Sequence, residues 1–371
     1  MIEFIEKIAT SFEIDIFLIL ILCSLSLASL GIFIVLKKNA MAIDAMSHSV
    51  LLGIIIAYFI VKDLNSPFLI IGATLFGVLT IFIIEFLQYD PKITKDAAIG
   101  IVFTFFFAIA IILISIYTRD VHLDVDAVFL GNIELGHFSQ LYKIIPLLLL
   151  NLGFILFCYK ELKIFIFDPM LAQMLGFSVF TINYIFMFLV SLTTVIAFDV
   201  IGSVLTIVCL IGPAATALLL TKKLLKCWLL SLWLAFFSTS LGYYGGIYCD
   251  LPIAGCIAIV ILIIFLLVLF FSPKEGVISK IIRHYIQRKK LRLLLLLMHL
   301  ANHEEQKKEN YIKQVQKDLN WRKDLYQKCL NQALKEKYIV LQESQQKIIL
   351  TNKGKIYLTQ KNKKWGIKIN P

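Results

Sequence analysis

Nine stretches of this sequence are long and apolar enough to cross a lipid bilayer as helices. The hydrocarbon core of a bilayer is about 30 Å thick, so a crossing helix needs about 17–25 consecutive, mostly apolar residues. Composition agrees, because 59% of the 371 residues are hydrophobic and 16% are charged, whereas a soluble domain has about 45–50% apolar and about 25% charged residues. We therefore predict an all-α polytopic membrane protein. Its spans lie at about 15–36, 40–61, 68–88, 97–117, 144–159, 179–198, 200–221, 227–248 and 253–271.

Lysine and arginine are distributed unequally between the loops on the two sides of these spans. One side carries Lys37, Lys38, Lys92, Lys95, Lys160, Lys163, Lys222, Lys223 and Lys226, and the other carries Lys7, Lys62, Arg119 and Lys143. Because cytoplasmic loops carry the excess of positive charge, nine alternating spans put the N-terminus outside and the C-terminal tail in the cytoplasm. The opposite loops are acidic, which attracts cations but is also common in proteins that transport none.

The chain changes character after residue 272, where the apolar spans give way to Lys, Gln, Asn and Glu. We predict a transmembrane domain at 1–272, a linker at 273–287 and a small cytoplasmic α+β domain at 288–371. Three helices followed by two short β-branched strands resemble a winged helix-turn-helix module, which would bind DNA through the helix that contains residues 321–335. Basic residues of that helix support DNA binding, namely Arg322, Lys323, Lys328 and Lys335. The alternative is a packing or dimerisation module whose lysines are solvated.

Asp44 and His48 are two ionisable residues inside the second span, in the segment AMAIDAMSHSV. Such residues cost about 2.5–3.5 kcal/mol each on insertion scales and usually face a bundle interior or a water-filled path. Their spacing puts them one turn apart on one helix face. A carboxylate and an imidazole suit a divalent transition metal. The alternative is a hydrogen-bonded pair that only holds helices together.

The segment AIDAMSHSVLLGI resembles the signature of the membrane permeases of ATP-binding-cassette importers for zinc, manganese and iron. Further similar segments follow in order at 98–115, 126–133, 167–179, 201–221 and 242–260, so the resemblance extends over about 15–272. It implies that Asp44 and His48 bind the metal in transit, and that the metal is the transported substrate rather than a permanently bound cofactor. The implied location is the bacterial cytoplasmic membrane. The winged-helix-like tail departs from the family, since most members lack it.

The resemblance also implies partners for the chain. These are a cytoplasmic ATP-binding-cassette ATPase, an extracytoplasmic metal-binding lipoprotein and a second, identical or similar permease subunit. The chain has no G-x-x-x-x-G-K-[ST] motif, so ATP hydrolysis must come from a separate subunit and this chain is not itself an enzyme.

A short cytoplasmic helix is predicted between the fifth and sixth spans. Asp168 and Pro169 are typical of a helix start, and Gly176 of the position after a helix end. With Ala172 and Leu175 between them, this segment resembles the coupling helix that contacts the ATPase in the family. The alternative is an ordinary loop helix.

Two further pairs of residues are candidates for roles in transport. Gly212 and Pro213 lie in the middle of the seventh span, where proline removes a backbone hydrogen bond and permits a kink suited to a gate. Asp199 and Asp250, near the outer ends of spans, are candidates to receive the ion from the binding protein.

Two other classes of function stay open at the level of sequence. One is a membrane-anchored, metal-responsive transcriptional regulator, in which the spans are the sensor and the tail is the effector. The other is a proton-coupled secondary metal transporter, which would use Asp44 and His48 without an ATPase. Which of manganese, zinc or iron is moved does not follow from these residues, because an Asp/His pair accommodates all three.

Overall fold

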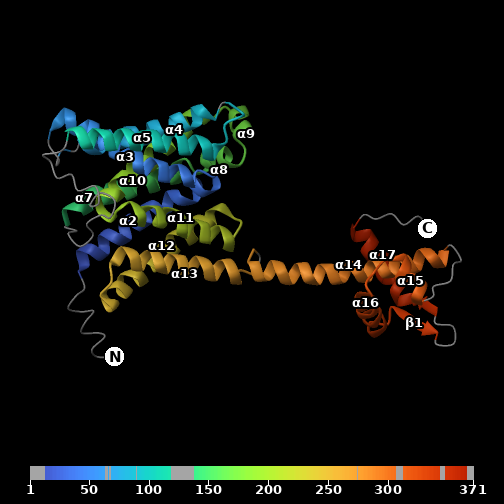
Figure 1. Ribbon diagram of the computed structural model, residues 1–371. Helices are drawn as coiled ribbons and strands as arrows, with labels where there is room; N and C mark the ends of the chain where they lie inside the picture. Colours follow the sequence, from blue (N-terminus) through green and yellow to red (C-terminus); the bar gives the residue numbers. More distant parts are fainter. Residues whose placement is uncertain are drawn as a thin grey trace. The chain divides into compact units, whose positions relative to one another are not determined.

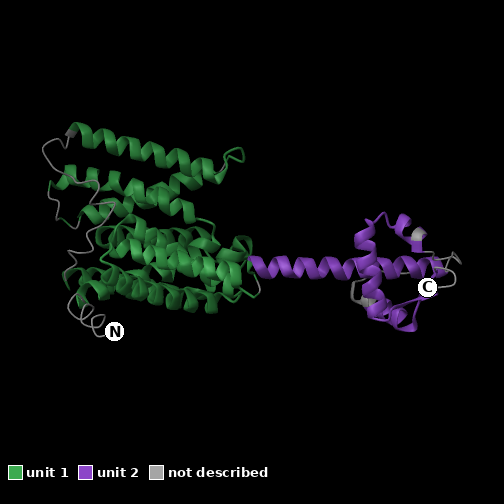
Figure 2. Cartoon of the chain, turned by 60° about the horizontal axis from the view of Figure 1, so that its bottom comes forward, with its two compact units in different colours: residues 1–276 green, residues 277–371 purple. Residues whose placement is uncertain are grey.

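The computed structural model describes residues 13–62, 66, 68–88, 90–117, 138–273, 275–305, 312–342 and 347–365. The chain divides into two units, residues 1–276 and 277–371, which Figure 2 colours separately. Residues 277–287, predicted as a linker, are helical and belong to the second unit. The domain limits at 272 and 288 stay predictions.

The first unit is built from helices (Figure 1). They are α2 (Ile14–Leu36), α3 (Ala40–Val61), α4 (Phe68–Leu87), α5 (Lys95–Tyr117), α7 (Leu141–Phe157), α8 (Tyr159–Phe167), α9 (Pro169–Met174), α10 (Val179–Ile201), α11 (Ser203–Leu220), α12 (Leu224–Cys249) and α13 (Ile253–Phe271), with the 3-10 helix η2 (Phe138–Gln140) before α7. Among the described residues, nine helical segments are long and apolar enough to span a membrane. This confirms the predicted number of spans.

Two span boundaries differ from the prediction. The sixth and seventh spans separate at Gly202, not at 198–200, because α10 continues to Ile201 and Gly202 has φ +78°. Glycine adopts a positive φ without a Cβ clash, so it ends one helix and begins the next. The fifth span begins earlier than predicted, since η2 leads into α7 and the two cover Phe138–Phe157.

Helix α2 is the most buried of the candidate spans, and it packs against α7, α10, α11 and α12. Small residues allow this, because without a Cβ at Gly31 the backbone of α11 approaches closely; an added Cβ would lie 1.9 Å from Leu210 O. Polar contacts add to the packing. Asn151 of α7 donates to Ser26 Oγ and Thr193 Oγ1, both at 2.9 Å.

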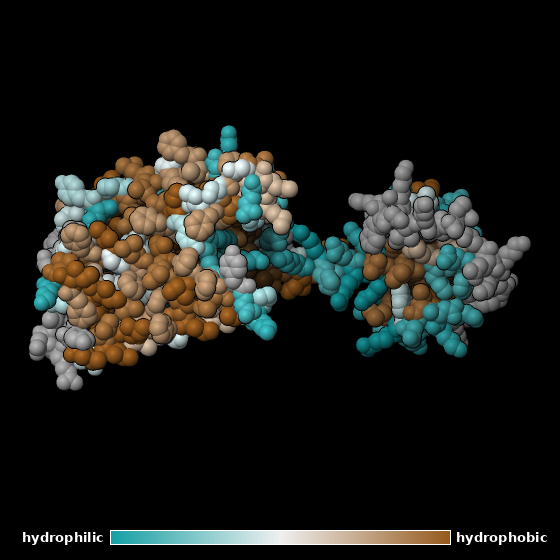
Figure 3. All heavy atoms as spheres, turned by 90° about the horizontal axis from the view of Figure 1, so that it is seen from above, coloured by the Kyte–Doolittle hydropathy of each residue, from teal (hydrophilic) through white to brown (hydrophobic). Residues whose placement is uncertain are grey.

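The outer surface of the first unit is largely apolar, as the brown areas over it in Figure 3 show. Large side chains are exposed there, including Phe105, Leu149, Phe157, Trp233 and Leu262. A soluble protein would not leave so many exposed apolar residues in contact with water. The surface is that of a unit surrounded by lipid.

The second unit contains helices and one small sheet. Its elements are α14 (Val277–Glu305), α15 (Ile312–Asp318), α16 (Lys323–Lys335), β1 (Ile339–Gln342), β2 (Lys347–Leu350) and α17 (Asn352–Trp365). The strands are antiparallel, with Ile339 opposite Leu350. Leucines of α14, such as Leu297 and Leu300, pack against Val315, Tyr326 and Ile348 in a separate apolar core.

Candidate functional site

Helix α3 has one open face, and Asp44 and His48 lie on it. Met41 and Asp44 are exposed and His48 is half-buried, whereas the neighbouring Ile43 and Met46 are fully buried. Positions 41, 44 and 48 share a face because a helix repeats every 3.6 residues. The ionisable pair therefore lines an accessible strip of an otherwise buried helix.

The His48 imidazole packs beside two aromatic rings of α5. Its ring centroid is 4.6 Å from that of Phe103 and 5.3 Å from that of Phe107. These contacts restrict the orientation of the imidazole while Asp44, one turn nearer the start of α3, is exposed. One carboxylate and one imidazole supply two ligands, fewer than the four to six that Zn²⁺ or Mn²⁺ takes, so the pair alone would not complete the coordination of such an ion.

Close packing against α4 fixes the position of α3. Gly53 and Gly72 face each other, so a Cβ added at Gly53 would lie 2.7 Å from Gly72 O. Further along, Ser191 of α10 donates a 3.0 Å hydrogen bond to Thr74 O of α4. Helix α3 thus packs against α4 through a direct approach of the two backbones.

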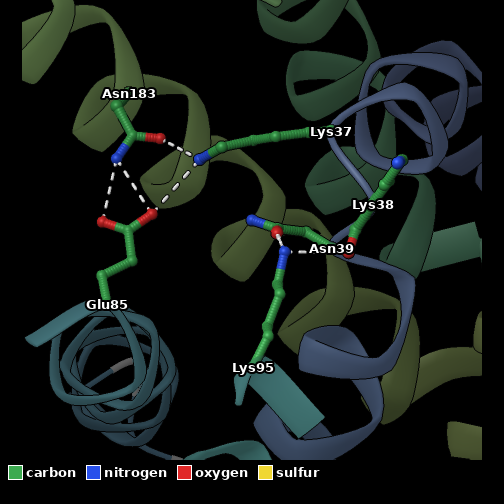
Figure 4. Close-up of polar contacts among 6 residues, drawn as sticks. All are labelled: Lys37, Lys38, Asn39, Glu85, Lys95 and Asn183. Atoms are coloured by element: carbon green, nitrogen blue, oxygen red, sulfur yellow. Dashed lines mark hydrogen bonds and ion pairs between the residues drawn. The ribbon is translucent and has the colours of Figure 1, made fainter. Parts of the chain in front are cut away.

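A polar network joins three helices just before α3 begins (Figure 4). Lys37 Nζ lies 3.2 Å from Glu85 Oε1 and also donates to Asn183 Oδ1, while Asn183 Nδ2 donates to both Glu85 oxygens at 3.1 and 3.2 Å. These residues come from the end of α2, from α4 and from α10. Burial lowers the pKa of Lys37, and the Glu85 carboxylate opposes that shift.

Lys95 extends this polar region to the start of α3. Its ammonium donates to the Asn39 side chain and, at 2.9 Å, to Lys38 O (Figure 4). Sequence reasoning missed both groups of contacts. The available signal was Glu85, a carboxylate inside the otherwise apolar third span, since an ionisable residue there requires a partner.

A cavity of about 430 Å³ lies between this network and the short helix α9. Lys37, Glu85 and Asn183 line it together with Phe165 of α8 and Gln173 of α9. The network and α9 therefore border the same cavity. We call this end of the helices the α9 end.

Helix α9 begins and ends at the residues the sequence indicated. Asp168 caps it by accepting a 3.0 Å hydrogen bond from Leu171 N, and Pro169 is its first residue. Gly176 follows with φ +84°, and its N–H donates to Gln173 O at 3.0 Å. Ala172 is fully buried and anchors the helix, whereas the exposed apolar side chains are Phe167, Met170, Leu171, Met174 and Leu175.

Gly212 and Pro213 lie within α11, which is helical on both sides of them. The missing Cβ of Gly212 accommodates Ile261 of α13, because an added Cβ would be 2.3 Å from Ile261 Cγ2. Pro213 is buried. The glycine therefore has a packing role, and the gating role of this pair stays a prediction.

The two outer aspartates have different surroundings. Asp199 Oδ2 lies 3.2 Å from Lys143 Nζ, and both side chains are about half exposed. Asp250 follows α12 with φ +52°, a left-handed conformation. Residues 118–137, predicted to form an acidic outer loop, lie outside the described residues.

Comparison with known proteins covers the membrane unit. Residues 10–272 match the model of the ABC 3 transport family. The chain is 38% identical over 285 residues to the manganese transport system membrane protein MntD of Bacillus subtilis, covering 74% of this chain and 96% of that protein. It is 35% identical over 300 residues to the zinc transport system membrane protein TroD of Treponema pallidum, covering 78% and 82%.

A solved structure has the same fold. It is PsaBC from Streptococcus pneumoniae in complex with Fab, which matches with a TM-score of 0.64 and 29% identity over 74% of this chain and 98% of that chain. The residues that match the family model contain Asp44, His48 and α9. The chain belongs to the ABC 3 transport family.

Proposed function

We propose that this chain is the permease subunit of an ATP-driven importer that moves a divalent transition metal, manganese or zinc, across the bacterial cytoplasmic membrane. The observation that carries the proposal is the pair Asp44 and His48 on the accessible face of α3. Membership of the family and the manganese and zinc named for its relatives support it. The metal is cargo, held only in transit.

Asp44 and His48 need further ligands to surround a metal ion. Two ligands from one chain leave at least two coordination positions vacant. A second permease subunit, identical or similar, supplies the facing wall of the path. The open strip at Met41, Asp44 and His48 is the surface on which the two subunits meet the ion.

ATP hydrolysis is the task of a separate ATPase, and α9 is the element that contacts it. An exposed cluster of apolar side chains on a six-residue helix is suited to insertion into a groove of another protein. Residues Asp168, Pro169 and Gly176 shape this helix and Leu175 contacts the partner. The α9 end is then cytoplasmic, as the distribution of lysine predicts, and the N-terminus is outside.

At the outer end, an extracytoplasmic lipoprotein delivers the ion. Asp199 and Asp250 are the residues proposed to receive it, with Asp199 exchanging its partner Lys143 for the cation. In the middle of the seventh span, Gly212 and Pro213 give α11 a point at which it can bend as the path opens.

The second unit is proposed to be a cytoplasmic regulatory domain of the winged-helix type. Its order of helices followed by an antiparallel strand pair is compatible with that fold. Arg322, Lys323, Lys328 and Lys335 are all exposed while Tyr326 and Ala333 of the same helix are buried. DNA binding through this basic face predicts an affinity that falls steeply with salt, measured with the full chain in lipid nanodiscs. If the chain binds no DNA, or binds it with an affinity that does not change with salt, the second unit acts instead as a packing or dimerisation module.

Uptake measurements test the main proposal. The chain is reconstituted in proteoliposomes with its ATPase and lipoprotein, and uptake of manganese and zinc is followed with Asp44→Ala and His48→Ala variants. We expect both to abolish uptake while assembly is retained. Asp96→Ala, which removes an exposed carboxylate at the start of α5, is the matched control and keeps uptake. Normal uptake by both site variants would contradict the path.

The same assay separates the alternative functions. A proton-coupled transporter would move metal without the ATPase and would respond to a pH gradient, whereas the proposed importer needs ATP. A membrane-anchored regulator would show no transport in any combination. Deleting residues 277–371 removes the unit through which a regulator would act. The deletion leaves every residue of the proposed transport path in place, so the proposed importer should still transport metal.

A further inference from the structure

The second unit contains a group of metal-ligand side chains that the transport mechanism does not use. His299 and His303 lie one turn apart on α14, and Asp318 is the last residue of α15. One ligand atom from each lies within 4.8 Å of the others. Asp318 Oδ2 is 3.7 Å from His299 Nε2 and 3.9 Å from His303 Nε2, and the imidazole centroids are 4.1 Å apart.

These distances are too long for hydrogen bonds, which require about 2.7–3.2 Å between heavy atoms. They are close to the separation of ligands around one ion, because metal bonds of about 2.0–2.2 Å in a tetrahedron hold ligand atoms roughly 3.3–3.6 Å apart.

Burial makes the group unusual for a solvated helix surface. The side chains of His299 and His303 are only 20% and 15% exposed. Within the described part of the chain, His299 Nε2, the nitrogen that lies 3.7 Å from Asp318 Oδ2, is buried without a hydrogen-bond partner. Buried polar atoms are normally satisfied.

We propose that His299, His303 and Asp318 form a second metal-binding site for one divalent transition-metal ion. Two imidazoles and one carboxylate suit Zn²⁺, Mn²⁺ or Fe²⁺, with water completing the coordination. The ion joins α14 to α15, whose Leu300 and Val315 share the core of the unit, and so stabilises this arrangement. If the tail is cytoplasmic, which rests on the proposed function, the site encounters the metal that has been imported.

Co²⁺ binding to the purified full chain in detergent tests the site, because Co²⁺ substitutes for these ions and absorbs visible light according to its ligands. The background is an Asp44→Ala, His48→Ala double variant, which removes the proposed transport site. We expect this background to bind one Co²⁺ per chain by equilibrium dialysis. Adding His299→Ala and His303→Ala should abolish that binding and its absorption bands. His284→Ala, an exposed histidine elsewhere on α14, is the matched control and should keep both.

Asp318→Asn gives a second measurement that does not depend on removing buried rings. It should weaken Co²⁺ binding at least tenfold while circular dichroism stays unchanged. Excess Zn²⁺ should displace the bound Co²⁺. The proposal is overturned if the background binds no Co²⁺, or if the histidine and aspartate substitutions leave its affinity unaltered. Neither outcome affects the transport assay, which depends on Asp44 and His48.

Discussion

The ammonium group of Lys37 lies 3.2 Å from the carboxylate of Glu85, and this ion pair ties the end of α2 to α4 where both approach α10. The two side chains are 19% and 30% exposed. Removing one partner leaves the other charge poorly solvated, with Asn183 as its remaining partner. The pair therefore fixes the relative positions of α2 and α4 at the α9 end of the helices.

Single substitutions of this pair should cost more than the double substitution. We expect Lys37→Met or Glu85→Gln to destabilise the permease by about 1–2 kcal/mol, reduced from the fully buried case because water reaches both groups. The double variant should recover part of that loss. Thermal unfolding in detergent measures the effect, and Lys38→Met, the exposed neighbouring lysine, is the control. Additive losses in the double variant would mean that the two charges do not interact.

Packing between α3 and α4 gives a second prediction. Gly53→Ala places a Cβ within 2.7 Å of Gly72 O, so the helices must separate. Overpacking of this kind costs about 1–3 kcal/mol and displaces the helix that carries Asp44 and His48. Gly100→Ala on α5 meets nothing within 4 Å and should be tolerated. Comparison of unfolding temperature and metal uptake for the two variants checks this, and equal behaviour would contradict it.

The spans were predictable because a bilayer requires long apolar helices, and few other patterns have that length. The predicted break between the spans at 179–198 and 200–221 falls at Asp199 rather than at Gly202. A charged residue near a helix end can reach the interface, so Asp199 does not have to lie outside the helix. Helix α9 was predictable from local signals alone, namely Asp168, Pro169 and Gly176.

Contacts between distant parts of the chain could not be predicted. Lys37 and Asn183 are separated by 146 positions, and the residues around each of them do not indicate that the two side chains meet. The same holds for Asp318, which reaches the two histidines because α15 packs its Val315 into the core with α14. In each case the apolar packing of helices determines which polar groups meet.

Helix α9 should tolerate apolar changes at its exposed residues but not charges. Leu175→Glu places a carboxylate in the apolar surface that is proposed to enter the ATPase, so we expect at least a tenfold loss of ATPase binding while the permease still folds. Leu175→Met keeps the surface apolar and is the control. A charge at Ala172 is less informative, because that side chain is fully buried and its replacement would disturb the helix itself. Co-purification of the ATPase with each variant provides the measurement, and undiminished binding by Leu175→Glu would move the contact elsewhere.

The exposed pair of Lys143 and Asp199 allows a test of how the ion first meets the permease. An exposed ion pair contributes only about 0–1 kcal/mol to stability, so neither Asp199→Asn nor Lys143→Met should change the unfolding temperature appreciably. Their effects on transport should differ in sign. Asp199→Asn removes an attractive charge and should slow uptake at limiting metal concentration by up to about tenfold, and Lys143→Met removes a competing cation and should leave uptake equal or faster. Both effects should fade as salt is added, because exposed charges are screened beyond about 8–10 Å at ordinary ionic strength. Equal and unchanged uptake by the two variants at low salt would show that Asp199 serves only as the partner of Lys143.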